Sequence, residues 1–308
     1  AVQRPAAVHG RPAPGDYITL TPAASRATTR PRRRPRLKPA RVLMGALLLL
    51  FIAFLAFPLL WLLSTAFKPL AEVFTARLIP QHPTWGNFGE AISDLGILQS
   101  AANTLKVSGL SAILTLAIAT PAAYGLARRP SGINWAVMLW ILVTQTFPVI
   151  LIIVPLFLIL ARAGLVNTHT GLVLVYVVWS LPFVLWMLQG YLAGIPVELE
   201  EAATVDGASQ AQVIRYILLP LIVPALVATG LYAFINAWNE FFFALVLLKS
   251  PELTTIQVNL SKLRGVEGLA RWGPLAAGSV LATIPTLILF TFMQRRIVSG
   301  LLSGGVKA

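Results

Sequence analysis

The chain has 308 residues, of which 57% are hydrophobic and only 11% are charged, and its mean hydropathy is +0.78. Soluble domains carry about 25% charged residues, so this composition excludes an ordinary soluble globular protein. The absence of cysteine excludes disulfides, thiolate catalysis and cysteine-ligated metals.

A basic, proline-rich segment, residues 1–41, opens the chain and holds +9 of the formal net charge of +13. A strongly basic protein could bind nucleic acid, but here the charge lies directly before the first apolar stretch. Lys and Arg in that position are typical of a cytoplasmic orientation signal that contacts the anionic head groups of the lipid bilayer. We therefore expect a disordered cytoplasmic tail and no nucleic-acid partner.

Six uncharged stretches of 21 to 35 residues follow, and each exceeds the ~18 residues that a membrane span requires. They predict an all-α, polytopic membrane protein with spans near 42–66, 104–127, 134–161, 170–193, 219–248 and 274–295. The transmembrane domain would cover residues 42–296, and a C-terminal tail would cover 297–308. With the basic tail inside, an even number of spans places both termini in the cytoplasm, in a cell (inner or plasma) membrane.

The loop between the fourth and fifth spans, residues 195–220, predicts two short helices joined by a turn. Pro196 suits the first position of a helix, and the acidic residues that follow it favour the positive helix end. Gly207 supplies the left-handed residue that ends this helix, and Ser209 with Gln212 predicts a capping box for the next one. These residues fit equally well a helix pair lying on the membrane and a docking element for another protein.

The same loop carries a motif, Glu201-Ala202-Ala203, then Gly207, then Ile217 and Leu219-Pro220. In these identities and spacings the chain resembles the permeases of ATP-binding-cassette (ABC) importers, in which this motif is called the EAA loop. With Asp206 directly before the glycine, the loop is similar to that of the sugar-transporting branch of these permeases. The resemblance implies the six-helix fold of type I importer permeases, with the loop as a coupling helix that docks on a cytoplasmic ATPase subunit. The docking residues that it implies are Glu200, Glu201, Ala202, Ala203, Asp206, Gly207, Ala208, Ile217, Leu219 and Pro220.

Three further stretches resemble the maltose-type permeases of that family: 237–241, 272–277 and the C-terminal segment from Gln294. The resemblance implies a C-terminal tail that inserts between two ATPase subunits, with contacts from Gly300, Gly304, Gly305 and Lys307. It also implies a homologous permease subunit and an extracytoplasmic solute-binding protein that delivers a sugar or oligosaccharide. Transport would proceed by alternating access, driven by ATP and Mg on the partner ATPase.

Polar side chains inside the predicted spans are candidates for the translocation pathway. Asn236, Asn239 and Glu240 are spaced i, i+3 and i+4, which puts them on one face of the predicted fifth helix. An ionisable residue at such depth normally faces the bundle interior or a water-filled cavity. Gln145 and Gln189 are further candidates. The alternative interpretation is that these groups only hydrogen-bond one helix to another. It has equal weight for the three residues of the fifth helix, and it is favoured over a pathway role for the two glutamines.

Sequence patterns for ATP binding and for covalent catalysis are missing. The chain lacks a Gly-x-x-x-x-Gly-Lys-Ser/Thr phosphate loop, a His-Glu-x-x-His pair and a Gly-x-Ser-x-Gly elbow. We therefore expect a non-enzymatic subunit with no metal or cofactor of its own. Two alternatives stay open beside a sugar importer: a polyol or glycerol-phosphate importer of the same family, and an ion-coupled secondary transporter with repeat-related halves. An intramembrane enzyme ranks third.

Overall fold

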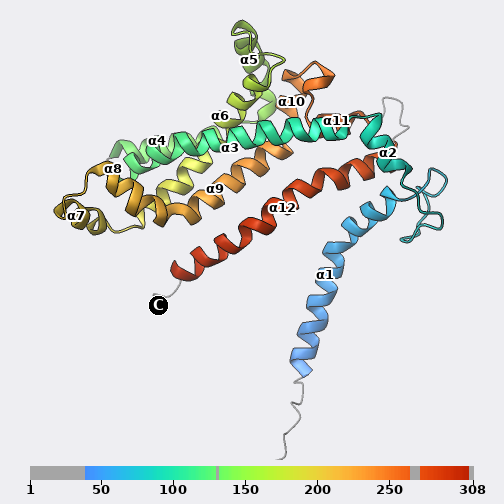
Figure 1. Ribbon diagram of the computed structural model, residues 1–308, viewed down its shortest axis with the longest axis horizontal. Coiled ribbons are helices and arrows are strands. Elements are labelled where there is room, and N and C mark those ends of the chain that lie inside the picture. Colours follow the sequence, from blue (N-terminus) through green and yellow to red (C-terminus); the bar gives the residue numbers. More distant parts are fainter. Residues whose placement is uncertain (1–38, 130–131, 264–270, 305–308) are drawn as a thin grey trace, which may run out of the picture. The chain divides into compact units, whose positions relative to one another are not determined.

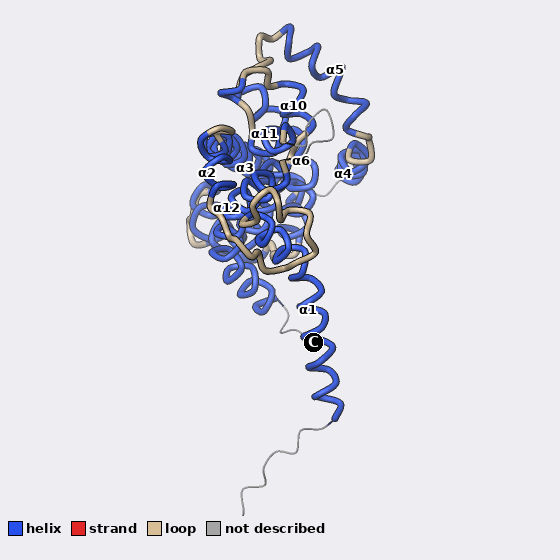
Figure 2. Tube along the Cα trace, turned by 90° about the vertical axis from the view of Figure 1, so that its right-hand side faces the viewer, coloured by secondary structure: helices blue, strands red, loops and turns tan. Residues whose placement is uncertain are grey.

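The computed structural model of the chain describes residues 39–129, 132–263 and 271–304. Within these ranges it consists of helices and loops without a strand, as Figures 1 and 2 show. The predicted all-α class is therefore confirmed. Contacts divide the chain into one unit at 1–52 and another at 53–308, and the packing described below lies within the second.

The helices follow one another with two short turns of other helix types between them. In chain order they are α1 (Pro39–Ala66), α2 (Gly86–Ser93), α3 (Ile97–Arg128), α4 (Gly132–Thr144), α5 (Val149–Arg162), α6 (His169–Ala193), α7 (Glu198–Val205), α8 (Gln210–Val213), the π-helical η1 (Ile214–Leu218), α9 (Leu219–Asn239), α10 (Phe242–Leu247), the 3₁₀ turn η2 (Pro251–Leu253), α11 (Ile256–Lys262) and α12 (Trp272–Gly304). Among the described residues, five helical stretches are long and apolar enough to cross a membrane. The bent pair α4 and α5 would form a sixth span.

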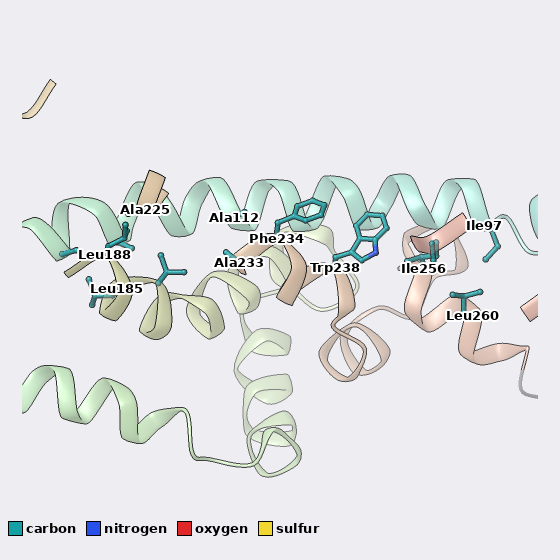
Figure 3. Packing of buried hydrophobic residues seen from close by; sticks show 14 of the residues in the cluster. Ile97, Ala112, Leu185, Leu188, Ala225, Ala233, Phe234, Trp238, Ile256 and Leu260 are labelled. Atoms are coloured by element: carbon teal, nitrogen blue, oxygen red, sulfur yellow. The ribbon is translucent and has the colours of Figure 1, made fainter. Parts of the chain in front are cut away.

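The core of the second unit is built around α3, which packs against α6 and α9 (Figure 1). The side of α3 that is buried carries mostly small residues, among them Ala112, Ala119 and Ala123. Small residues let helix backbones approach closely, which is the usual basis of helix packing in membranes. The facing helices supply the larger side chains. Figure 3 shows these larger side chains along α3, namely Leu185, Leu188, Phe234, Trp238, Ile256 and Leu260, with Ala225 and Ala233 between them.

The third predicted span, 134–161, differs from the structure because it is not one helix. α4 ends at Thr144, α5 begins at Val149, and the two helices meet at an angle of 97°. Pro148 stands before α5 in an extended conformation (φ −61°, ψ 126°). Proline lacks the N–H of a continuing helix and disfavours helical geometry in the residue before it, so the chain breaks at this point.

The fifth predicted span, 219–248, is also interrupted. α9 ends at Asn239, Glu240 is extended (φ −70°, ψ 134°), and α10 follows as a separate short helix. The expectation that Asn236, Asn239 and Glu240 share a single helix face is therefore wrong for Glu240, which lies just beyond the helix. Two smaller differences concern helix starts. α3 begins at Ile97 rather than 104, and Pro196 lies two residues before α7 instead of at its first position.

Candidate functional site

The loop between α6 and α9 is folded as predicted, and α7 is its most exposed element. Three acidic residues occupy the first turn of α7, and none of the helix's eight residues is buried. Val205 at its C-terminal end is 87% exposed. A short helix that leaves an apolar side chain in the open and buries no residue gains little from packing on its own chain. Its exposed face is therefore available to another protein.

The turn after α7 explains why a glycine stands at position 207. Gly207 has a left-handed backbone (φ +87°). Its N–H donates to the Thr204 carbonyl, and the Ala208 N–H donates to the Ala203 carbonyl, both at 3.0 Å. This pair of hydrogen bonds is the Schellman motif, in which the left-handed position is normally glycine. The prediction that Gly207 ends the first helix is confirmed.

The next helix begins at Ser209 and runs on into the membrane-spanning α9. The side-chain oxygen of Gln212 accepts a hydrogen bond from the Ser209 N–H at 2.7 Å, as the predicted capping box requires. One π-helical turn, η1, joins α8 to α9, with the Leu219 N–H donating to the Ile214 carbonyl. Pro220 lacks an N–H for the regular helical bond to the Tyr216 carbonyl, which accounts for the wider turn. The segment with Ile217 and Leu219 is thus rigidly continuous with α9.

Most of the docking residues implied by the family resemblance are solvent-accessible in this loop. Glu201, Ala202, Asp206, Gly207, Leu219 and Pro220 are exposed, and Ala203, Ala208 and Ile217 are half-buried. Glu200 differs from them, because its side chain is only 12% exposed and forms an ion pair with Arg128 of α3 at 2.5 Å. The Tyr124 hydroxyl donates to the other oxygen of the same carboxylate at 2.8 Å.

Arg128 also joins the end of α6 to this cluster. Its Nη1 donates to the carbonyls of Leu192 (3.1 Å) and Ile195 (3.2 Å), which lie where α6 ends. A cation at this position compensates the negative end of a helix dipole. Arg128 and Tyr124 were not among the residues predicted from the sequence. The sequence signal that could have indicated this ion pair is a basic residue directly after the predicted span 104–127 and an acidic cluster after the predicted span 170–193.

A cavity of about 490 Å³, mostly apolar but with three polar side chains in its lining, is bounded by residues of α5, α6, α9 and α10. Asn236, Asn239 and Glu240 line it, together with the aromatic rings of Trp179, Tyr232, Phe241, Phe242 and Phe243. The structure thus brings these three predicted pathway residues to one cavity, although Glu240 is outside the helix. Gln145 lines a separate, largely apolar cavity of about 270 Å³ and donates to the Trp179 carbonyl at 3.4 Å. Gln189 is half-buried on α6 and lines neither of these two cavities.

Both carboxylate oxygens of Glu240 accept hydrogen bonds from groups of its own chain. One oxygen accepts from the Phe243 N–H at 2.9 Å. The other accepts from the Ala244 N–H at 3.1 Å and from the Tyr176 hydroxyl at 2.8 Å. Glu240 therefore caps the first turn of α10 and ties it to α6. Asn236 and Asn239 use their amide N–H groups within α9, on the Tyr232 hydroxyl (3.0 Å) and the Ile235 carbonyl (2.9 Å).

The C-terminal candidates lie at or beyond the end of the described chain. α12 continues to Gly304, so Gly300 and Gly304 lie on this helix, while Gly305 and Lys307 are outside the described residues. Among the described residues, no group of three or more His, Cys, Asp or Glu side chains could hold a metal ion.

Comparisons with known proteins place the chain in a family. Residues 117–302 match the family described as "binding-protein-dependent transport system inner membrane component". The chain belongs to this family of transport permeases. It is 50% identical over 229 residues to a putative ABC transporter permease of Streptomyces antibioticus, covering 74% of this chain and all of the relative. It is 34% identical over 277 residues to the trehalose/maltose permease MalG of Thermococcus litoralis, covering 89% of this chain and 99% of the relative.

Among solved structures, the chain is similar in fold to a chain of a bacterial ABC transporter that imports the acidic polysaccharide alginate. The TM-score is 0.71 and the sequence identity 24%, and the match covers 85% of this permease and 99% of that chain. The predicted fold of an ABC importer permease is confirmed by this match. Family membership decides against an ion-coupled secondary transporter and an intramembrane enzyme. This permease is a membrane-embedded transport subunit.

Proposed function

We propose that this permease is driven by a separate ATPase that docks on the α7–Gly207–α8 loop, and that it imports a neutral sugar or oligosaccharide. The observation that carries the first part is the exposed α7, which is folded and capped but buries none of its residues. Its acidic first turn offers charges to basic residues of a partner. The two alanines and Gly207 allow that partner to approach the backbone closely.

The assembly that follows from this docking has further members. A single permease with up to six spans needs a homologous permease to enclose a pathway, and two ATPase subunits would then serve the pair. ATP and Mg would be bound by these ATPases. Docking places the α7 loop in the cytoplasm, and with an even number of spans both termini lie there too. A solute-binding protein would then deliver substrate on the outer side of the inner membrane.

The proposed solute class rests on the relatives and on the cavity lined by Asn236 and Asn239. The relative of Thermococcus litoralis is named a trehalose/maltose permease. The lining of the cavity combines aromatic rings with amides, which is the chemistry that stacks on sugar rings and hydrogen-bonds hydroxyl groups. None of the described residues that line the cavity is basic, and the carboxylate of Glu240 is hydrogen-bonded by its own chain. A phosphorylated solute would need a cation here, so the glycerol-phosphate alternative is disfavoured. A polyol fits the same chemistry and is the second candidate.

Docking can be tested with two exposed apolar residues that are matched in accessibility. Val205 on α7 is 87% exposed, and Ile79 in the loop after α1 is 80% exposed. The tagged chain would be purified from its native membranes as wild type, Val205→Asp and Ile79→Asp, and the co-purified ATPase would be quantified. We expect Val205→Asp to reduce ATPase recovery at least about fivefold, as for loss of an interface residue worth ~1 kcal/mol or more. Ile79→Asp should retain it.

Equal ATPase recovery in all three samples would contradict docking at α7. The solute class is tested separately with the purified, reconstituted complex. ATP-dependent uptake of radiolabelled disaccharides, polyols and glycerol phosphate would be compared in vesicles that contain the cognate binding protein. Uptake of glycerol phosphate without uptake of any neutral carbohydrate would refute the neutral-solute assignment.

A further inference from the structure

We propose that Arg128 is the residue that passes movement of α7 to α3 and α6 during transport. The proposal rests on the proposed docking of an ATPase at α7 and names the link between that docking site and the membrane helices. Three elements meet at this single side chain. Arg128 is the last residue of α3, its partner Glu200 is in the first turn of α7, and its carbonyl acceptors lie at the end of α6.

The link matters because α7 has little other attachment. It buries no residue, and among the described elements it packs mainly against α8, which follows it in the chain. The backbone connects α7 to α6 on one side and, through α8, to α9 on the other. It offers no connection to α3. Side-chain hydrogen bonds from α3 reach α7 at Glu200, from Arg128 and from Tyr124. A force on α7 therefore reaches α3 through this carboxylate.

The low solvent exposure of both side chains strengthens the ion pair between Arg128 and Glu200. The side chains of Arg128 and Glu200 are 11% and 12% exposed, so water screens their attraction much less than that of a surface pair. An arginine can hold a carboxylate and two carbonyls at once because its guanidinium presents several donors in a rigid plane. Displacement of α7 would leave these buried charges unpaired unless α3 and α6 followed.

In the described part of the chain, one nitrogen of the guanidinium keeps its two N–H donors unpaired. Among the described residues, Nη2 of Arg128 is buried and has no hydrogen-bond partner. A buried, unpaired donor is costly in a static structure. Such a donor can favour a second arrangement of the same helices if it finds an acceptor in that arrangement. Such a two-state side chain is what coupling between distant sites requires.

The test uses the whole transporter, reconstituted with its partner permease, ATPase and binding protein. Arg128→Gln removes the charge and the fork, Arg128→Lys keeps the charge alone, and Glu200→Gln changes the carboxylate to an amide of the same shape. Arg129→Gln is the matched control, because Arg129 is the exposed next residue and loses the same charge. For each variant, the co-purified ATPase, the ATP hydrolysed and the solute transported would be measured.

We expect Arg128→Gln and Glu200→Gln to keep the ATPase bound and active but to transport less solute per ATP by at least about fivefold, the lower end of measured couplings between sites. Arg128→Lys should fall between them and wild type, and Arg129→Gln should match wild type. A merely structural role would lower the amount of complex without changing solute transported per ATP.

Unchanged solute per ATP in both Glu200→Gln and Arg128→Lys would overturn the proposal, even if Arg128→Gln failed to assemble. Loss of the ATPase from Glu200→Gln would also overturn it, because Glu200 would then be a docking residue. Failure of the proposed function looks different, since the wild-type complex itself would then contain no ATPase or transport nothing on addition of ATP.

Discussion

Replacement of Gly207 by alanine isolates the contribution of one backbone conformation to the α7 loop. Gly207 has φ +87°, and a Cβ added there would meet no atom within 4 Å. The cost is therefore conformational rather than steric. An L-residue with a side chain loses about 1–2 kcal/mol in the left-handed region. A penalty of that size lowers the ratio of ordered to disordered turn about 5- to 30-fold.

Packing in the loop offers little to absorb this penalty, because α7 buries no residue. The strain should therefore appear locally, as faster hydrogen exchange at the Gly207 and Ala208 amides that close the turn. It should also weaken ATPase binding by the same factor of about 5 to 30 if the partner recognises the ordered loop. Both can be measured on the purified permease, by exchange mass spectrometry over residues 198–213 and by titration with the ATPase.

Two matched variants test the conformational explanation. Gly207→Asn should cost less than Gly207→Ala, because asparagine tolerates the left-handed region. Gly125 in α3 is also surrounded by open space, with no atom within 4 Å of an added Cβ, but it lies inside a helix. Gly125→Ala should stabilise the permease by roughly 0.5–1 kcal/mol. Unchanged exchange in Gly207→Ala, or an asparagine that is worse than alanine, would refute the explanation.

Three further predictions concern polar groups elsewhere in the chain. Glu240→Ala should lower the free energy of unfolding by about 1–3 kcal/mol, because it leaves the Tyr176 hydroxyl and two N–H groups unpaired; thermal unfolding in detergent measures this, and an unchanged Tm would contradict the capping role. Asn167 has φ +59° and its side chain binds Lys249 and Ser250, so Asn167→Ala should loosen the 249–250 loop, with about 1–3 kcal/mol lost and faster exchange there. Hydrogen bonds from His82 and then from the Gln81 N–H hold the pKa of Glu72 below its usual value. The stability contributed by this carboxylate is present above its unfolded-state pKa and is lost as the pH falls through the lower folded-state pKa. The protection of the Gln81 amide, taken relative to its unstructured exchange rate at the same pH, should therefore fall in acid in wild type. In Glu72→Gln this protection should be independent of pH over that range; identical profiles would refute the assignment.

The features that could be predicted from the sequence are those that depend on local chemistry. Apolar length predicted the spans that correspond to α6 and α12, since α6 (His169–Ala193) lies within one residue of the predicted 170–193. The preference of Gly207 for a left-handed backbone and of Ser209 for a helix start predicted the turn between α7 and α8. The length of an apolar stretch predicts a span because it must match the thickness of the bilayer. The glycine predicts the turn because helix ends depend on a few neighbouring residues. Contacts between distant segments, such as Arg128 with Glu200, have no such signal.

The broken spans show what apolar length cannot reveal. The stretches 134–161 and 219–248 are long enough to cross a membrane, and neither hydropathy nor charge distinguishes a straight helix from two shorter ones. In the first, Pro148 ends the run of backbone hydrogen bonds. In the second, the Glu240 carboxylate takes over the N–H groups of α10, which a straight helix would have used internally. A proline and a buried acid in such stretches indicate a break only when the packing around them is known.

The two breaks also explain where the cavity lined by Asn236 and Asn239 lies. Backbone that leaves a helix inside a membrane must be buried in protein or line a cavity, because lipid offers no hydrogen-bond partner. Val149, the first residue after one break, and Glu240 and Phe241, at the other, all line the cavity of about 490 Å³. The cavity thus forms where α5 and α10 turn away from the directions of α4 and α9. Restoring either helix, for example by Pro148→Ala together with lengthening of α4, would remove lining residues from the cavity. If an ATPase docks on α7 as proposed, a permease with such a restored helix should still co-purify with it but should no longer transport solute.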